Sequence, residues 1–202
     1  MFKNPFKNRK KEEAFWDWFS RNASRYYRFN QNQSALFTEL KVKLAEIHPD
    51  IVFEFSANLN NGIRELVISA DGIKSIFPIV SNLVSKAPHL KNWKFTAFRQ
   101  PRPDITQIKY QGLIINIDDV FFKYSKIAGD IDLELYIRGF SESPEWTAAS
   151  FILLDIVLGE YYTTTRIGSI EKRALDEGEV DTLIPIRALA QLVEEHHSQL
   201  NN

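Results

Sequence analysis

A four-residue pattern occurs twice in this chain, 69 residues apart. Residues 65–68 read Glu-Leu-Val-Ile, and residues 134–137 read Glu-Leu-Tyr-Ile. Each copy follows a strand-like run and a turn, and each precedes a helix-like segment and a further run that opens on an aromatic residue, Trp93 or Tyr162. Because strands and helices differ in their hydrophobic period, this order of segments predicts two related strand-strand-helix-strand units.

The two units predict an α+β protein built on antiparallel sheet, with two helices before the units and one after them. We expect residues 11–202 to form a single domain, with pseudo-repeats at about 51–98 and 118–170. A proline- and arginine-rich stretch at about 99–104 is the expected linker, and residues 1–10 are an expected basic flexible tail. Internal duplication explains the pattern, and so does convergence on a common α+β arrangement.

Helical periodicity is clearest in four segments, residues 11–28, 34–47, 75–86 and 144–158. Their expected stops and starts include Ser34 and Ser143 as N-caps and Gly159 as a C-terminal stop. On the helix at 144–158, the expected buried face is Phe151, Leu154, Ile156 and Leu158. A last helix follows Pro185.

Turn signals separate the predicted strands. Asn61-Gly62 favours a tight hairpin turn, because such turns require positive φ. Gly129-Asp130 predicts the corresponding turn in the second unit. Residues 105–116 predict an extra strand that Gly112 interrupts. Threonines favour strand structure, so residues 161–170 are expected to form the last strand of the second unit.

Composition narrows the class of protein. Hydrophobic residues make up 44% and charged residues 25%, as in ordinary soluble proteins. The absence of cysteine excludes disulfides, thiolate metal sites and a cysteine nucleophile. No apolar run approaches the roughly 18 residues of a membrane span, and the N-terminus lacks the apolar stretch of a secretory signal. We therefore expect a cytoplasmic protein without a membrane span.

The formal net charge of −1 conceals an uneven distribution. Residues 1–11 carry five basic residues and no acidic one, which leaves 20 basic against 26 acidic residues in the rest of the chain. An acidic folded region predicts that nucleic acid is not the partner. Phe2 and Phe6 alternate with lysines in the tail, so contact with anionic lipid is an alternative to a solvated tail.

Few residues have the spacing that a known metal site or catalytic site requires. His196-His197 in the last predicted helix point about 100° apart, so the pair cannot chelate one metal, and we interpret it as a solvated helix end. Asp118, Asp119 and Glu134 are the carboxylates that a metal site or an acid–base pair would use. Turn and surface roles explain the same residues. We expect no cofactor, no metal site and no catalytic residue.

Aromatic and basic residues suggest binding instead. A pseudo-twofold arrangement would leave a groove between the units, and the expected ligand-binding residues are Trp93, Arg99, Arg102, Tyr110, Tyr136 and Tyr162. Trp16 and Trp18 point about 200° apart on one helix, so both cannot face the same core. With Phe15, Trp18 and Phe19 on the sheet, we expect Trp16 at the solvent boundary as an anchor for a partner or a second copy of the chain.

Three segments together resemble a family of uncharacterised bacterial cytosolic proteins. They are Phe15-Trp16-Asp17-Trp18-Phe19, the run from Glu65 to Gly72, and the run from Trp93 to Arg99. A further similar stretch, from Leu154 to Tyr161, extends the resemblance over most of the chain. The resemblance implies no activity, so it assigns no functional residue. The duplicated order of elements also looks like the two-module ligand-binding folds of the gyrase-inhibitor-like class, an analogy of architecture alone.

The favoured function is non-catalytic binding of a protein partner or a small ligand in the groove between the pseudo-repeats, with a homodimer as one form of partner. A metal-dependent or carboxylate-based hydrolase using Asp118, Asp119 or Glu134 is the first alternative. A protein that neutralises a toxin, of the immunity type, is the second, and it matches the acidic balance of the folded region.

Overall fold

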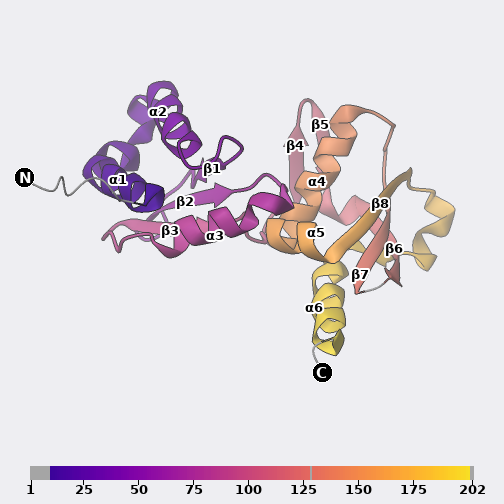
Figure 1. Cartoon of the computed structure of the whole chain (residues 1–202). Helices are drawn as coiled ribbons and strands as arrows, with labels where there is room; N and C mark the ends of the chain where they lie inside the picture. The colour runs from indigo at the N-terminus through magenta and orange to yellow at the C-terminus, as the bar shows by residue number, and fades with distance from the viewer. Residues whose placement is uncertain (1–9, 128, 201–202) are drawn as a thin grey trace, which may run out of the picture. The chain divides into compact units, whose positions relative to one another are not determined.

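The computed structural model describes residues 10–127 and 129–200, and the chain forms two compact units, Met1–Phe98 and Arg99–Asn202 (Figure 1). Each unit is described by itself. The boundary falls where the expected linker begins, and the assignment of residues 11–202 to one domain stays a prediction. The basic tail falls outside the described residues except for Lys10.

The first unit contains a three-stranded sheet in the order β1-β2-β3 (Val52–Phe55, Arg64–Ser69 and Trp93–Ala97). Strands β1 and β2 pair antiparallel, whereas β3 runs parallel to β2. The loop between β1 and β2 turns at Asn61-Gly62, where both residues have positive φ, 50° and 75°. The positive φ values confirm the predicted turn. The parallel pairing of β3 with β2 makes the sheet mixed rather than wholly antiparallel.

Three α-helices belong to the first unit: α1 (Lys11–Tyr27), α2 (Gln33–Ala45) and α3 (Phe77–Ser85). Short 3-10 turns, η1 (Phe29–Gln31) and η2 (Lys74–Ile76), precede α2 and α3. Pro78 lies in the first turn of α3, where its missing N–H is not needed. The prediction that Ser34 is an N-cap is wrong, because α2 begins at Gln33 and Ser34 lies inside the helix. The backbone carbonyl of Ser34 accepts a hydrogen bond from the Thr38 hydroxyl.

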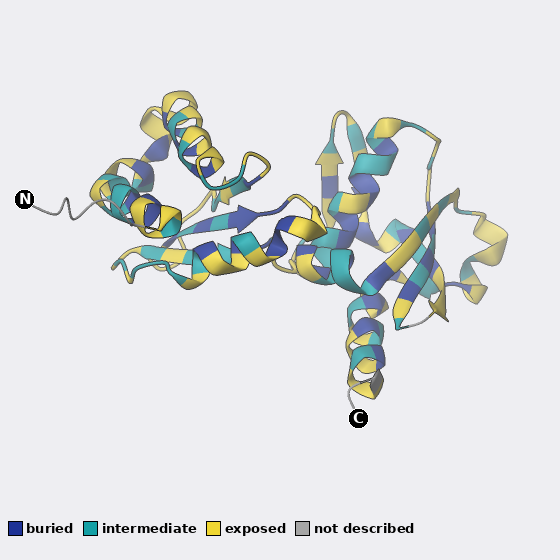
Figure 2. Cartoon of the chain, viewed as in Figure 1, coloured by how far each residue is buried: buried dark blue, intermediate teal, exposed yellow. Residues whose placement is uncertain are grey.

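Aromatic rings fill the core of the first unit. Phe19 is fully buried, with ring centroids 5.1 Å from Trp93 and 5.5 Å from Phe95. The expectation that Trp16 lies at the solvent boundary is wrong. Trp16 is only 3% exposed, and its indole N–H donates to the Leu83 carbonyl at 2.7 Å. Trp18 is partly buried instead, so the inward-facing aromatic residues of α1 cover a wider arc than one stripe. Figure 2 shows buried, intermediate and exposed positions along this helix.

The second unit contains a hairpin and a four-stranded sheet. Strands β4 (Gln107–Tyr110) and β5 (Leu113–Asn116) form the hairpin, so Gly112 marks a turn between two strands. The larger sheet has the order β8-β7-β6-β9, with β6 (Val120–Ile127) antiparallel to β7 (Asp130–Ile137). Strand β8 (Ile167–Ala174) runs parallel to β7, and the two-residue β9 (Ile184–Pro185) pairs antiparallel with β6.

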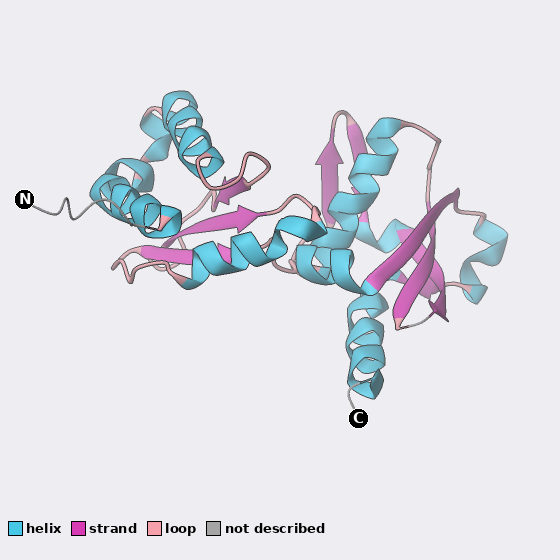
Figure 3. Cartoon of the chain, viewed as in Figure 1, coloured by secondary structure: helices cyan, strands magenta, loops and turns pink. Residues whose placement is uncertain are grey.

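The helices of the second unit are α4 (Pro144–Leu158), α5 (Glu160–Arg166) and α6 (Leu189–Leu200), with 3-10 turns η3 (Ile117–Asp119), η4 (Glu177–Thr182) and η5 (Ile186–Ala188) (Figure 3). Tyr162 was expected to open a strand, but it lies in α5, and β8 begins five residues later. A buried helix start at Glu160 outweighs the strand preference of the threonines, because tertiary contacts override a preference worth tenths of a kcal/mol.

Helix α4 is the apolar centre of the second unit. Its predicted cap and stop are confirmed: the Ser143 hydroxyl accepts the Trp146 N–H at 3.3 Å, and Gly159 ends the helix at a φ of 79°. Leu154 and Leu158 are buried as expected. Phe151 is not, since it is 48% exposed with the Lys172 ammonium over its ring.

The two units repeat one arrangement: an antiparallel hairpin, a helical connection, and a third strand parallel to the second. The matched residues occupy equivalent places. Leu66 and Leu135 are fully buried, whereas Glu65 and Glu134 lie on the other face and approach a basic residue of the third strand. The shared arrangement agrees with the predicted pair of units, and internal duplication stays a prediction.

No helix in residues 10–127 and 129–200 combines the length and the hydropathy that crossing a membrane requires.

Candidate functional site

The junction of α4 and α5 holds an unusual amount of buried polar surface. Gly159 lies between the two helices, and a Cβ added there would lie 2.8 Å from the Pro101 ring and 3.1 Å from the Arg99 carbonyl. Glycine is therefore required both by the positive φ and by the close approach of residues 99–101. The stretch expected as a linker is thus attached to the second unit.

Glu160 fixes that attachment. Its side chain is fully buried, and one carboxylate oxygen accepts the Arg99 N–H at 3.1 Å. The Glu160 N–H in turn donates to the Arg99 carbonyl at 2.9 Å, and the Arg102 N–H donates to the Ile156 carbonyl at 2.7 Å. A buried carboxylate costs several kcal/mol unless it is hydrogen-bonded, and the Arg99 N–H supplies such a bond. The two backbone bonds hold residues 99–102 at the junction of α4 and α5.

Asp155 lies one turn before this junction and is mostly buried. Burial raises the pKa of its carboxyl from 3.8 to about 6, although the Arg99 guanidinium favours the ionised form; the charge of Glu160 raises the pKa further. The Arg99–Asp155 pair spans 3.4 Å. Asp155 therefore changes its charge between mildly acidic and neutral pH.

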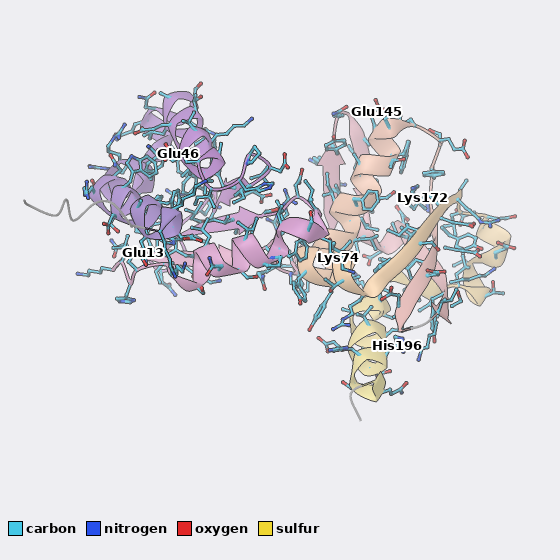
Figure 4. All side chains as sticks on the ribbon, in the orientation of Figure 1. Glu13, Glu46, Lys74, Glu145, Lys172 and His196 are labelled. Carbon is cyan, nitrogen blue, oxygen red and sulfur yellow. The ribbon has the colours of Figure 1, made fainter. Side chains whose placement is uncertain are left out.

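Helix α5 also carries the polar side chains Thr163 and Arg166, and Arg166 contacts α6. The Thr163 hydroxyl approaches Asp155 closely enough to favour its ionised form, but it completes no hydrogen bond of good geometry. One turn later, Arg166 Nη2 lies 3.0 Å from His197 Nε2 of α6. The neighbouring His196 is only 8% exposed, and Figure 4 marks its position on α6. We refer to Thr163, Arg166, His196 and His197 as the α5–α6 polar cluster.

Three polar atoms of this cluster are buried without a hydrogen-bond partner: Thr163 Oγ1, Arg166 Nε and His196 Nε2. Within residues 10–127 and 129–200, only one other side-chain atom shares this condition, Nε of Arg64 in the first unit. An unsatisfied buried polar group costs about 1–3 kcal/mol, so the occurrence of three such atoms on α5 and α6 requires an explanation.

The expected ligand-binding residues belong to both units, so their convergence in one site stays a prediction. Trp93 belongs to the first unit, where it stacks on Phe95. In the second unit Tyr136 is buried and donates to Glu134 at 2.8 Å, while Tyr110 and Tyr162 pack against the apolar core. Because the units are described separately, a groove between them stays a prediction. The Arg102 side chain is exposed.

The carboxylates of the hydrolase alternative are held by arginines. Asp118 accepts from Arg187 at 2.6 Å, and Asp119 accepts from Arg138 at 2.9 Å and from Asn116 at 2.8 Å. The Asn116 amide and the Arg138 guanidinium lower the pKa of Asp119 despite its partial burial. Glu134 lies 3.7 Å from Arg173. Across the described part of the chain, no three His, Asp or Glu side chains converge as metal ligands.

Sequence reasoning missed the α5–α6 polar cluster and Glu160. The assignment of the histidine pair to a solvated helix end is wrong for His196, which is buried. The periodic signal was available, because Leu189, Val193 and His196 are spaced by four and three residues and lie on one face of α6. Arg166 and Thr163 gave no such signal, since the threonine-rich run predicted a strand.

Comparison of the chain with protein-family models, with curated proteins and with solved structures found no match. The resemblance to a bacterial family therefore stays a prediction, and the functional argument depends on the chain's own residues.

Proposed function

We propose that the chain is a non-catalytic binding protein whose second unit holds a small polar ligand at the α5–α6 polar cluster. The observation that carries the proposal is that three of the four unpartnered buried side-chain atoms among the described residues belong to α5 and α6. A ligand that supplies the missing hydrogen bonds would recover the free energy that the free protein forgoes.

The first unit provides the contrast that supports this interpretation. Its buried Arg64 donates to three backbone carbonyls, of Ser56, Ala57 and Tyr27, and stacks 4.7 Å from the Phe29 ring. Arg64 thus completes the fold of its own unit. Arg166 has one polar partner, a histidine ring, and this difference favours a binding role over a structural one.

Binding is favoured over hydrolysis because Asp118, Asp119 and Glu134 are occupied by arginines and do not converge. The proposed place lies within the second unit and does not depend on a groove between the units.

The test is a thermal-shift screen of neutral and charged metabolites, followed by titration calorimetry of any compound that stabilises the protein. Thr163→Val should weaken binding by about tenfold, the effect of losing one hydrogen bond of 1.4 kcal/mol. Thr165→Val is the matched control, because the Thr165 hydroxyl donates to the Tyr161 carbonyl within the same helix. A ligand that binds both variants and the wild type equally would place the site elsewhere and refute the proposal.

A further inference from the structure

The turn between β1 and β2 carries two neighbouring residues that can react with each other. Among the asparagines of the chain, Asn61 alone precedes a glycine. Asparagine is one of the thermolabile residues of proteins, and a following glycine places no side chain beside the asparagine amide. Asn61 and Gly62 are both exposed, and a Cβ built on Gly62 would have no atom within 4 Å. The reactive groups are therefore accessible to each other and to water.

Few bonds hold this turn closed. Asn60 and Ile63 exchange two backbone hydrogen bonds of 3.1 and 2.9 Å, in a bridge that lies outside the named strands. The Tyr27 hydroxyl donates to the Gly62 carbonyl at 2.9 Å. Among the described residues, none accepts the Gly62 N–H and none bonds to the Asn61 side-chain amide. Exposed loops with few contacts open locally at a small cost in free energy, so the turn opens more readily than the sheet.

We propose that Asn61 is a site of spontaneous deamidation, which converts the chain into aspartyl and isoaspartyl forms. When the turn opens, the Gly62 nitrogen loses its proton to a solvent base and attacks Cγ of Asn61. The new N–Cγ bond closes a cyclic imide, while the Cγ–Nδ2 bond breaks and the nitrogen leaves as ammonia. Water then hydrolyses the imide, so the reaction needs no oxidant and no reactant besides solvent. The inference concerns the first unit and does not rest on the proposed function.

The two carbonyls of the imide give different products. Attack of water at Cγ restores the main chain and gives an aspartate, which the turn accepts because Asp-Gly favours the same tight geometry. Attack at the main-chain carbonyl leaves the backbone running through the former side chain, an isoaspartyl link with one extra backbone atom. A two-residue turn with an extra atom cannot keep both bonds between Asn60 and Ile63. Both products add one negative charge.

The isoaspartyl form should disturb the buried arginine of the first unit. The Gly62 carbonyl accepts the Tyr27 hydroxyl, and the Tyr27 carbonyl accepts Arg64 Nη2 at 3.1 Å. The carbonyls of Ser56 and Ala57, in the same loop, accept Arg64 Nη1 at 2.6 and 3.2 Å. Displacing acceptors of a buried charge is costly. We therefore expect the isoaspartyl form to be less stable than the aspartyl form.

The experiment incubates the full chain at mildly alkaline and at mildly acidic pH, and follows each asparagine by peptide mapping with mass spectrometry. Asn61 should convert several-fold faster than Asn58 and Asn60, which are exposed in the same loop but do not precede glycine. Conversion should be faster at the alkaline pH, because the attacking nitrogen must lose its proton. Equal rates at the three asparagines would overturn the inference.

Asn61→Gly is the matched control for the reaction. Gly-Gly also fits a tight hairpin turn, and the variant has no amide to lose at this position. Incubation should produce an acidic form of the wild type, detected by ion-exchange chromatography, and none of the variant. An acidic form that accumulates equally in both proteins would place the modification elsewhere and overturn the inference.

Asn61→Asp separates the effects of the two products. This variant carries the new charge without the extra backbone atom, so its melting temperature should stay close to that of fresh wild type. Converted wild type contains the isoaspartyl form and should melt at a lower temperature. Equal melting temperatures for converted wild type and Asn61→Asp would overturn the proposed effect on the turn. None of these outcomes bears on the proposed ligand site, which lies on α5 and α6.

Discussion

The two units use the same order of strands and complete it in different ways. In the first unit, one short helix, α3, leads from β2 to β3, and the sheet is covered by aromatic residues from α1, which precedes the repeat. In the second unit the connection is longer, because α5 follows α4 before β8 begins. The added helix buries Glu160 and Thr163 rather than apolar residues.

The two units also differ in how they satisfy their buried polar side chains. The first unit buries a polar side chain, Arg64, but bonds it to carbonyls of its own loops and to aromatic rings. The second unit leaves an unpartnered buried atom on Thr163 and on Arg166 of the added helix, and another on His196 of α6. The same order of strands in the two units therefore accommodates different buried polar groups where one connection differs.

The largest expected effect tests the aromatic core of the first unit. Phe19→Ala should lower the free energy of unfolding by about 3–5 kcal/mol, because a fully buried ring is replaced by a cavity. Chemical denaturation measures the change. Phe151→Ala in the second unit is the control for loss of a phenylalanine, since that ring is 48% exposed and should cost less than about 1 kcal/mol. Similar costs at the two positions would contradict the contrast between these helices.

The second prediction tests the apolar centre of the other unit. Leu154→Ala should cost about 2–5 kcal/mol through lost burial and the cavity that remains. Denaturation curves monitored by tryptophan fluorescence would show whether one unit loses stability before the other. A cost below about 1 kcal/mol would show that α4 is not the centre of its core.

The third prediction tests the junction that distinguishes the second unit. Gly159→Ala should destabilise the protein by about 1–3 kcal/mol, because its φ of 79° and ψ of 153° form a conformation that only glycine adopts readily. Contact of the new methyl with Pro101 adds to this cost. The control is Gly62→Ala, also at positive φ but with no atom within 4 Å of the added Cβ. Denaturation should rank Gly159→Ala as the more damaging change, and the reverse order would contradict the close approach.

The smallest expected effect concerns the pH dependence of Asp155. Its pKa is raised from 3.8 to about 6, so the folded state holds the proton more tightly than the unfolded state. The contribution of Asp155 to stability is therefore fully present below about pH 4 and declines as the pH rises to about 6. Asp155→Asn should abolish this decline.

The measurement for Asp155 is the difference in unfolding free energy between wild type and variant at pH 4, 5, 6 and 7. Using the difference removes the opposite trend from carboxyls whose pKa is lowered, such as Asp119. A difference that does not change with pH would show that Asp155 is solvated in the folded protein.

Local sequence signals determined most of the secondary structure. The helices α1, α3 and α4 follow from apolar spacing, and the turn at Asn61-Gly62 follows from the need for positive φ. Gly112 was expected only to interrupt one strand, and it lies instead in the turn between the two strands of a hairpin. The repeated Glu-Leu pattern predicted two related units, and in the structure Leu66 and Leu135 of the two copies are both fully buried. These features depend on a few neighbouring residues, so periodicity and turn chemistry are sufficient to predict them.

Tertiary structure alone decided the parts that depend on distant residues. Trp16 is buried, and its indole N–H donates to the carbonyl of Leu83, 67 residues away. The threonine run forms α5 rather than a strand, with Glu160 bound to the Arg99 backbone 61 residues earlier. The pairing of Arg166 with His197 likewise joins two helices that no local pattern connects. Local preferences amount to tenths of a kcal/mol per residue, and long-range burial and hydrogen bonding outweigh them.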